Sequence, residues 1–343
     1  MVDRYRKQAL FSGIGEAGQQ RLLDSRVTLI GCGALGSVIA DTLVRAGVGF
    51  LRIVDRDFVD LSNLQRQVLF DEADVAERLP KAIAAARKLR AINRQVTLNP
   101  QVLDVTPANV LELITGADVI LDGTDNFEIR YLLNDAAVET GTPWIHAGCV
   151  GSHGQMMSIL PGQTPCLRCV MPEIPAPGSS ETCDTAGVIG PAVQIMASLQ
   201  CVDALKILTG QTDLIVPALT VVDVWQGTWR RIDLARLLAD GQCPCCQGTE
   251  RPWLSGAAGI RTSVLCGRNS VQISPGTSAG WTLPQLADRL GTSGNIRVTP
   301  FLLIFQPSES QTELTIFPDG RAIITGTEEI SEAKSIYARY LGL

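Results

Sequence analysis

The sequence predicts an α/β fold, with a doubly wound, mostly parallel Rossmann-like sheet, an antiparallel extension and a small C-terminal α+β domain. Apolar runs of strand character alternate with helical patterns from residue 27 to about residue 148, which is typical of a parallel sheet with crossover helices. The composition then changes near residues 243–259, and a shorter series of strands and helices follows. A length of 343 residues suits two domains, which we expect at 1–250 and 251–343.

The first strand-to-helix turn carries a glycine-rich motif. Residues 27–36 read VTLIGCGALG, an apolar strand followed by Gly31, Gly33 and Gly36. Such glycines permit a tight turn and close approach of a ligand, and the amide groups that open the helix bind phosphate. Asp55 follows Gly36 by nineteen residues, where a carboxylate can hold ribose hydroxyls. This motif alone fits NAD at least as well as ATP.

The polar residues that follow favour a triphosphate. A proline before Lys81 suits the start of a helix and would place this lysine in the first turn, near the anion site. Arg66 has a planar guanidinium that can hold two phosphate oxygens. A strand at 119–121 would deliver Asp122 and Asp125 to the carboxyl edge of the sheet, where ligands bind in such folds. We expect Asp125 to anchor Mg²⁺. The alternative is that Asp125 only caps the next helix and that Lys81 is solvated.

Two C-x-x-C pairs predict a structural zinc site. Cys166 with Cys169 and Cys243 with Cys246 are separated by 73 intervening residues. Four thiolates can surround one Zn²⁺ tetrahedrally and would tie together two distant segments of the sheet domain. Two redox-active pairs are the alternative interpretation. Cys245, inside the second pair, is expected to be a bystander.

Other cysteines and the two histidines receive weaker predictions. Cys183 lies in a segment rich in proline, glycine and serine, 171–184, which we expect to be a mobile loop just before a helix; this is the setting of a reactive thiol. Cys32 is expected to be simply a small residue of the glycine turn. His146 and His153 are expected to flank a strand–loop junction, without a ligand or base role.

Composition excludes several classes of protein. The net charge of −6 gives no broad cationic surface for nucleic acid. Ten cysteines without a secretory signal favour metal or reactive thiols over disulfides. The most apolar segment, 188–208, is interrupted by Asp203 and Lys206, which argues against a membrane span. We therefore expect a cytoplasmic protein.

Further elements complete the expected fold. Strands at 154–160, 219–224 and 228–234 would extend the sheet in mixed orientation. The C-terminal part would contain a helix that starts at Thr282, a hairpin turn at 318–320 and a final helix with one apolar stripe. Strands are expected there at 263–267, 270–273, 301–306, 313–317 and 321–325.

These residues resemble the ThiF/MoeB/HesA family, the prokaryotic relatives of ubiquitin-activating enzymes. The resemblance covers roughly the first 247 residues. It rests on RYRKQ (4–8), GCGALG (31–36), VDRD (54–57), SNLQRQ (62–67), DGTDN (122–126), both C-x-x-C pairs and TCDTAGVIGP (182–191). It implies an ATP-dependent adenylyltransferase that activates the C-terminal glycine carboxylate of a small ubiquitin-like sulfur carrier protein of the ThiS/MoaD type, ending in Gly-Gly. The resulting thiocarboxylate would feed thiamine, molybdopterin or thiolated-tRNA synthesis.

The resemblance also implies roles for individual residues. Arg66, Lys81 and Asp125 would be catalytic through positioning and charge neutralisation, and Cys183 is a candidate for sulfur transfer or a thioester. A homodimer is implied, because Lys7 would reach the nucleotide of the partner subunit. The implied nucleotide-binding set is Gly31, Gly33, Ala34, Gly36, Asp55, Asp57, Ser62, Asn63, Gln65, Arg66, Lys81, Asp125 and Asn126.

Two departures and several alternatives remain open. Lys7 stands where relatives usually carry arginine, and lysine lacks the bidentate fork, although Arg6 could substitute. Ala34 stands where relatives often have glycine. The alternatives are activation of a small-molecule carboxylate or a tRNA base, as in threonylcarbamoyladenosine dehydratase relatives, a non-catalytic nucleotide-binding scaffold, and an NAD-dependent dehydrogenase. The C-terminal domain could dock the carrier or a sulfur donor, or extend the dimer.

Overall fold

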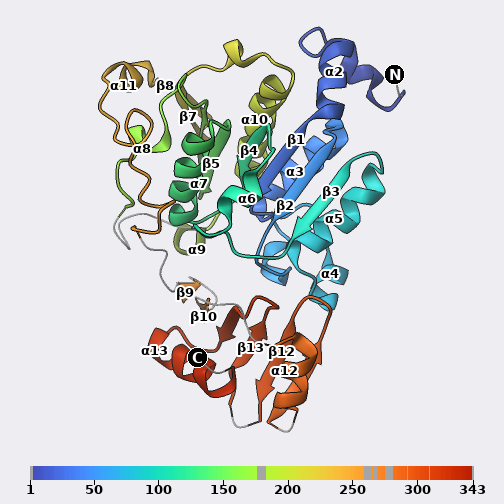
Figure 1. Ribbon diagram of the computed structural model, residues 1–343. Coiled ribbons are helices and arrows are strands. Elements are labelled where there is room, and N and C mark those ends of the chain that lie inside the picture. The colour runs from blue at the N-terminus through green and yellow to red at the C-terminus, as the bar shows by residue number, and fades with distance from the viewer. Residues whose placement is uncertain are drawn as a thin grey trace. The chain divides into compact units, whose positions relative to one another are not determined.

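The structure is a computed structural model of the whole chain, shown in Figure 1. It describes residues 3–175, 183–258, 264–265, 269–274, 281–291, 293–308 and 310–341. The chain divides into two compact units, Met1–Gly259 and Ile260–Leu343, which we describe separately.

The first unit is built on an eight-stranded sheet with the order β3-β2-β1-β4-β5-β6-β7-β8. The first five strands in this order pair in parallel, and β5 through β8 pair antiparallel. This confirms the predicted mostly parallel sheet with an antiparallel extension. The strands are β1 (Arg26–Ile30), β2 (Phe50–Val54), β3 (Thr97–Gln101), β4 (Val119–Asp122), β5 (Trp144–Val150), β6 (His153–Ile159), β7 (Ala218–Asp223) and β8 (Thr228–Asp233).

Helices cover both faces of this sheet. Successive residues of its central strands point to opposite faces and are apolar, so both faces are packed against helices. Val27 and Leu29 of β1 pack in one core with α3, α5 and α10, whereas Ile30 packs in the other core with α6 and α7. The helices are η1 (Asp3–Tyr5), α1 (Arg6–Ala9), α2 (Gly15–Asp24), α3 (Ala34–Ala46), η2 (Leu61–Asn63), α4 (Glu72–Glu77), α5 (Lys81–Ile92), α6 (Val110–Ile114), α7 (Phe127–Thr140), α8 (Leu167–Val170), α9 (Cys183–Ala186), α10 (Gly190–Leu208), η3 (Thr212–Leu214) and α11 (Ala235–Ala239).

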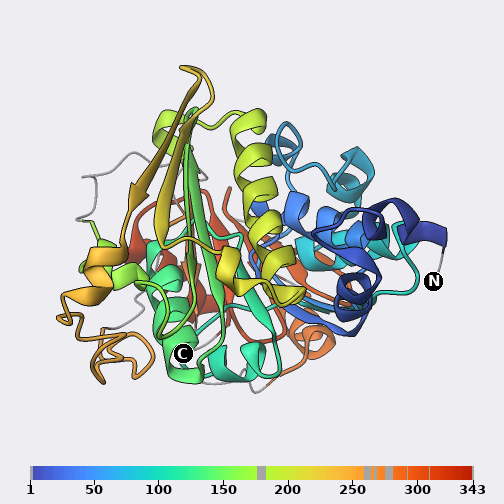
Figure 2. The same ribbon diagram turned by 90° about the horizontal axis from the view of Figure 1, so that it is seen from above.

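The longest helix of this unit, α10, lies along α3 and contacts β4, β5 and β6 (Figures 1 and 2). Among the described helices it alone is long and apolar enough, by length and composition, to cross a membrane. Its side chains Val193, Met196 and Ala197 are nevertheless buried in the core with α3. The contacts are those of a core helix.

The second unit is a six-stranded antiparallel sheet with the order β11-β12-β13-β14-β10-β9, packed with α12 and α13. The predicted helix start at Thr282 is confirmed: Thr282 caps α12 through a reciprocal bond with Gln285. Ala333 and Tyr337 of α13 are buried against the sheet. The elements are β9 (Val264–Leu265), β10 (Ser270–Ile273), α12 (Leu283–Leu290), β11 (Gly294–Val298), β12 (Leu303–Pro307), β13 (Glu313–Ile316), β14 (Ala322–Thr325) and α13 (Ile330–Tyr340).

Three local predictions need correction or lie outside the described residues. His146 is in the interior of β5 and does not flank a loop. Cys183 is the first residue of the short helix α9, and not part of a loop; most of the predicted loop, 176–182, lies outside the described residues. The strand β11 was not predicted, because GNIRV lacks an apolar pattern and pairs with β12 alone.

Candidate functional site

The carboxyl ends of β1, β2 and β4 lie side by side, because β1 pairs with both other strands. The chain turns sharply after β1 at Gly31, which has a φ of +85°. A Cβ atom on Gly31 would lie 2.7 Å from the backbone of Gly123, and one on Gly36 would lie 2.0 Å from the Gly31 carbonyl oxygen. These two glycines therefore serve close backbone packing. At Gly33 an added Cβ would meet only the Gln67 side chain, at 3.8 Å, so this position stays open.

The buried carboxylate of Asp55 connects the glycine turn to the end of β2. Its Oδ2 accepts a hydrogen bond from the Cys32 amide at 2.6 Å, and its Oδ1 accepts one from the Asp57 amide at 2.7 Å. Burial raises the pKa of Asp55, against the opposing effect of the Lys81 charge. Burial also raises the pKa of the Cys32 thiol, which keeps it protonated, as expected of a small turn residue.

Lys81 lies in the first turn of α5 and points to the same edge. Its ammonium is bonded to Asp57 Oδ2 at 3.1 Å, and the residue is only 4% exposed. The alternative of a solvated Lys81 is therefore wrong. The structure brings Lys81, Asp57 and Asp55 together with the glycine turn.

Arg56 is a second cation at this edge. Its Nη1 is 3.2 Å from Asp104 Oδ2. Burial disfavours the charge of Arg56, but nearby carboxylates hold its pKa above the ordinary value. They belong to Asp104, Asp57 and Asp125.

The SNLQRQ segment contains two buried amides, and that of Gln67 lies next to the glycine turn at Gly33. Asn63 and Gln67 are 2% and 3% exposed, and the side-chain oxygen of each has no hydrogen-bond partner among the described residues. Buried polar atoms normally find a partner, so these oxygens mark a place for a polar ligand. Arg66 is half-buried and donates to the Ser62 carbonyl at 3.0 Å, while Gln65 is exposed.

Of the two acids after β4, only Asp125 is accessible. Asp122 is fully buried and bonded to Thr124 through Oδ1, and to His146 at 2.8 Å and Arg130 at 3.3 Å through Oδ2. The prediction that Asp122 reaches a ligand at the edge is not met, because its lone pairs are used internally. Asp125 is exposed in the loop before α7. The capping atom of α7 is instead the Asn126 side-chain oxygen, which accepts from the Ile129 amide.

The network of Asp122, His146 and Arg130 fixes the loop that carries Asp125. Arg130 Nη2 donates to the Thr124 carbonyl at 2.6 Å and to the Ala147 carbonyl at 3.3 Å. Burial alone would raise the pKa of Asp122, but the Arg130 and His146 side chains hold it below the ordinary value. Burial lowers the pKa of His146 despite its bond to Asp122, so this histidine is neutral at pH 7.

We expect the buried His146 to make stability depend on pH. Its folded-state pKa is below its unfolded value, so its contribution is complete above about pH 6.5 and is lost as pH falls toward the folded pKa. Between pH 7.5 and 5.5 the loss should approach about 1 kcal/mol, measured by urea unfolding. His146→Gln should flatten this dependence. His153→Gln is the matched control, because His153 is exposed; equal slopes in both variants would contradict the assignment.

The two C-x-x-C pairs form one cluster. The sulfur atoms of Cys166, Cys169, Cys243 and Cys246 all lie within 4.8 Å of one another. Three of the separations are 3.9, 3.7 and 3.4 Å. A tetrahedron with zinc–sulfur bonds of about 2.3 Å has edges of about 3.8 Å, so the four thiols fit a single ion without an open position.

The remaining predicted residues are distributed over the surface and loops. Lys7 is exposed on α1, next to the exposed apolar side chains of Leu10 and Phe11. The Ser62 hydroxyl is bonded to Asp60 at 2.6 Å. The side chain of Cys183 lies outside the described residues.

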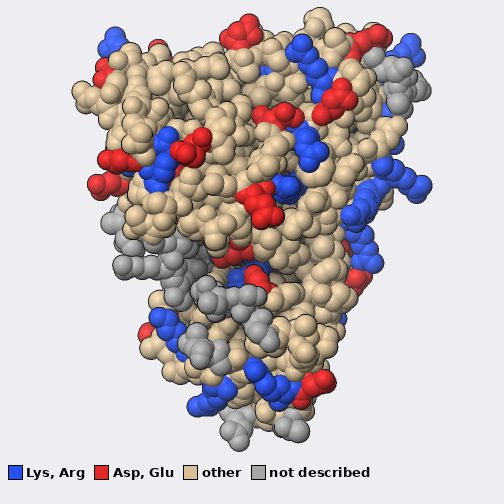
Figure 3. Space-filling model, in the orientation of Figure 1, with Lys and Arg blue, Asp and Glu red and all other residues tan. Residues whose placement is uncertain are grey.

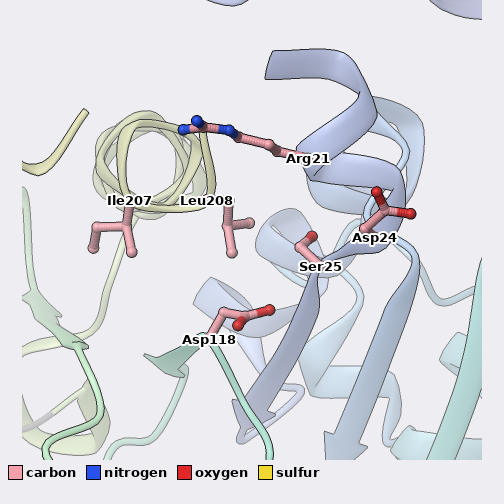
Figure 4. Close-up of a pocket in the computed structure, with 6 residues that line it drawn as sticks. All are labelled: Arg21, Asp24, Ser25, Asp118, Ile207 and Leu208. Atoms are coloured by element: carbon pink, nitrogen blue, oxygen red, sulfur yellow. The ribbon is translucent and has the colours of Figure 1, made fainter. Parts of the chain in front are cut away.

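A hollow of about 390 Å³ lies at the opposite edge of the sheet (Figure 4). Ser25 and Asp118 in its wall directly precede β1 and β4, so they mark the amino ends of these strands. Arg21 reaches across it and donates to the Thr209 carbonyl at 2.7 Å. Ligands of open parallel sheets bind at the carboxyl edge, and we do not assign this hollow to the site.

Charged side chains of both signs lie on the surface (Figure 3). On the face shown in Figure 3, acidic and basic side chains are interspersed among larger uncharged areas. The net charge of −6 gives the protein no overall positive charge that would favour nucleic acid.

Three residues of the site were missed by sequence reasoning: Arg56, Gln67 and Arg130. Gln67 belongs to the recognised SNLQRQ motif, so its position in that motif was an available signal. Arg56 and Arg130 carry no local signal, because their roles depend on residues brought close by the fold.

Comparison with known proteins agrees with this geometry. The model of the ThiF family matches residues 5–245. A Bacillus subtilis (strain 168) protein named sulfur carrier protein ThiS adenylyltransferase is 44% identical over 343 residues, covering 100% of both chains. An Escherichia coli (strain K12) protein of the same name is 40% identical over 249 residues, covering 72% of this chain and 95% of its own.

Solved structures confirm the fold. The crystal structure of E. coli MccB with MccA-N7isoASN superimposes with a TM-score of 0.63 at 22% identity, over 72% of this chain and 74% of that one. At this level of identity the likeness concerns the arrangement of the sheet and helices alone.

Proposed function

This chain belongs to the ThiF family, and from that premise we propose that it is an ATP-dependent adenylyltransferase acting on a small ubiquitin-like sulfur carrier protein. The carrier's C-terminal glycine carboxylate would be activated for thiocarboxylate formation. Two relatives whose names state ThiS adenylyltransferase activity support the proposal, and one of them matches along its full length.

The observation that carries the proposal is the buried Lys81 ammonium, bonded to Asp57 at the end of β2, together with the unpartnered Gln67 oxygen next to the glycine turn. A dehydrogenase has no need for this additional cation. We propose that Asp55 and Asp57 bind the nucleoside side of the ligand. Lys81 and Arg66 would contact its phosphates, because both side chains belong to segments that border the turn.

The proposed reaction is an in-line displacement. A carboxylate oxygen of the carrier forms a bond to the α-phosphorus of ATP, the bond between this phosphorus and the bridging oxygen breaks, and pyrophosphate leaves with the electron pair. No general base is needed, since a carboxylate is ionised at pH 7. The residues contribute by positioning and by neutralising charge on the leaving group.

We propose Asp125 as the residue that holds Mg²⁺. Its carboxylate is exposed at the carboxyl edge, and Mg²⁺ binds to one or two carboxylates together with substrate phosphates. When bound, the ion would supply charge stabilisation at the phosphates.

We further propose that Cys166, Cys169, Cys243 and Cys246 hold a structural Zn²⁺. Their sulfur separations support this. The positions of the pairs support it as well, because one pair lies at α8 and the other after α11, so that one ion would join two distant segments. A closed four-thiolate site supplies stability and no open position for chemistry. Cys183 stays a proposed sulfur-handling residue.

The assembly and the domain division of the chain are also proposed. We propose a cytoplasmic homodimer in which Lys7 reaches the partner's site; its exposure on α1 beside apolar Leu10 and Phe11 supports this. We also propose that residues 1–250 carry the adenylation activity and that 251–343 form an accessory domain. In support, the E. coli relative has 95% of its length matched by 72% of this chain.

The test is ATP–pyrophosphate exchange with a purified ThiS-type carrier that ends in Gly-Gly. We expect exchange with this carrier, an adenylate mass increment on it, and neither with a carrier that lacks the last glycine. A small-molecule carboxylate and tRNA serve as alternative acceptors. Modification of either one, without exchange on the carrier, would replace the proposal by another activity of the same fold.

A further inference from the structure

The helix α7 contacts the loops of both C-x-x-C pairs through two adjacent, fully buried polar residues. Asn134 Oδ1 accepts a hydrogen bond at 2.8 Å from the amide of Leu167, which follows Cys166. Asn134 Nδ2 donates to the sulfur of Cys245 at 3.3 Å, and Cys245 lies between the two cysteines of the second pair. One asparagine side chain therefore reaches an internal residue of each pair.

Asp135 extends this network to the segment after the second pair. Its Oδ1 accepts from the Cys245 thiol at 3.4 Å, and its Oδ2 accepts from the amides of Trp253 at 3.0 Å and Leu254 at 3.4 Å. Asp135 is itself fully buried. Burying a carboxylate is costly unless its oxygens are bonded, so its place here calls for a specific role.

A third residue of α7 contacts the segment that leaves the first pair. The Tyr131 hydroxyl donates to the carbonyl groups of Met171 and Glu173, both at 2.8 Å. Its ring packs against Trp253, with 5.6 Å between the ring centres. Residues 131–135 of one helix thus contact an internal residue of each pair and the segments that follow both pairs.

From these contacts we propose that Asn134 and Asp135 are positioning residues for the metal cluster, which hold the two C-x-x-C loops in the conformation that binds an ion. Cys245 is then not a bystander but the link between both residues and the second loop. The inference rests on the proposed Zn²⁺ at the four cysteines. It is independent of the adenylation chemistry.

The physical reason is preorganisation. Four thiolates at these separations repel one another, and the ion must also fix two loops that are distant in sequence. Bonds from a rigid helix to the internal residues of both loops remove much of that ordering cost before the ion binds. Partners outside the ligand shell commonly change metal affinity by about 10- to 100-fold.

The experiment uses the full-length zinc-loaded protein and competition with a chromophoric chelator, without ATP or carrier. Asp135→Asn keeps the volume but replaces one accepting oxygen by a donor, and we expect zinc affinity to fall by about 10- to 100-fold. Thr140→Ala is the matched control on the same helix. Among the described residues the Thr140 hydroxyl is bonded to the Ala136 carbonyl and to Thr142, and the variant should bind zinc as the wild type does.

Two variants of Cys245 test the same inference if Asp135→Asn fails to fold. Cys245→Ala should still bind one zinc per chain, with an affinity lowered in the same direction, whereas Cys245→Ser should stay close to the wild type. Wild-type affinity in folded Asp135→Asn, or in Cys245→Ala, would overturn the inference. A wild-type protein that holds no zinc would instead remove the metal site, and it would leave the adenylation proposal untouched.

Discussion

Asp125→Ala is expected to lower ATP–pyrophosphate exchange by about a thousandfold, because it removes the proposed Mg²⁺ ligand from the carboxyl edge of the sheet. The fold should be unaffected, since Asp125 is exposed and the adjacent α7 is capped by Asn126. The measurement is exchange at saturating carrier, with thermal unfolding of the same preparation. The loss should lie mainly in the rate constant and not in carrier affinity.

The matched control is Asp240→Ala, which removes an exposed aspartate beyond α11. Lys81→Met is a second probe of the same pocket. It should also abolish exchange, and because it removes the ammonium that is bonded to the Asp57 carboxylate, it should in addition lower the unfolding midpoint. Full exchange by a folded Asp125→Ala protein would remove this residue from the proposed chemistry.

Removal of the metal is expected to cost on the order of 4 kcal/mol of unfolding free energy, the value for closing a loop of this length. The ion would join residues 166–169 to residues 243–246, which lie far apart in the sequence. Urea unfolding before and after exhaustive chelation measures the change, and elemental analysis gives the metal content. Restoring Zn²⁺ should restore the midpoint.

Substitution provides the control for chelation. Cys166→Ser should reproduce the metal-free stability, because it removes a fully buried ligand. Cys149→Ser, which changes a half-buried cysteine of β5 outside the cluster, should keep the metal. Equal stability of metal-loaded and metal-free wild type would show that the cluster contributes nothing to the fold.

Most of the sheet unit could be predicted because its signals are local. The alternation of apolar strands with helical segments, the glycines after β1 and the proline before Lys81 each act within a few residues of their effect. The same holds for the zinc-type cysteine pairs, whose spacing alone suggests four ligands. In the second unit, the cap at Thr282 and the 318–320 turn are equally local.

The internal network around Asp122 could not be predicted, because it depends on strand register. The pairing of Ile120 with Trp144 and Leu121 with Ile145 brings Asp122 beside His146 one step later. Nothing near His146 in the sequence reports this neighbour. The same reasoning explains why Asp122 was expected at the ligand-binding edge together with Asp125, although only Asp125 is exposed.

The two outer margins of the eight-stranded sheet differ in their capacity to grow. In β3 the amide of Thr97 and the carbonyl of Gln101 form hydrogen bonds on the side of β2. Alternate residues of a strand bond to the same side, so the backbone of Pro100 faces away from β2, and Pro100 has no N–H to offer an added strand. The β3 edge is therefore a poor site for the addition of another strand. β8 carries no such interruption and is exposed along its length, with Trp229 and Ile232 uncovered, and Figure 2 shows its hairpin with β7. Of the two margins of this sheet, β8 is therefore the one that is open to backbone pairing with another strand, and a proline in β8 is expected to block such pairing.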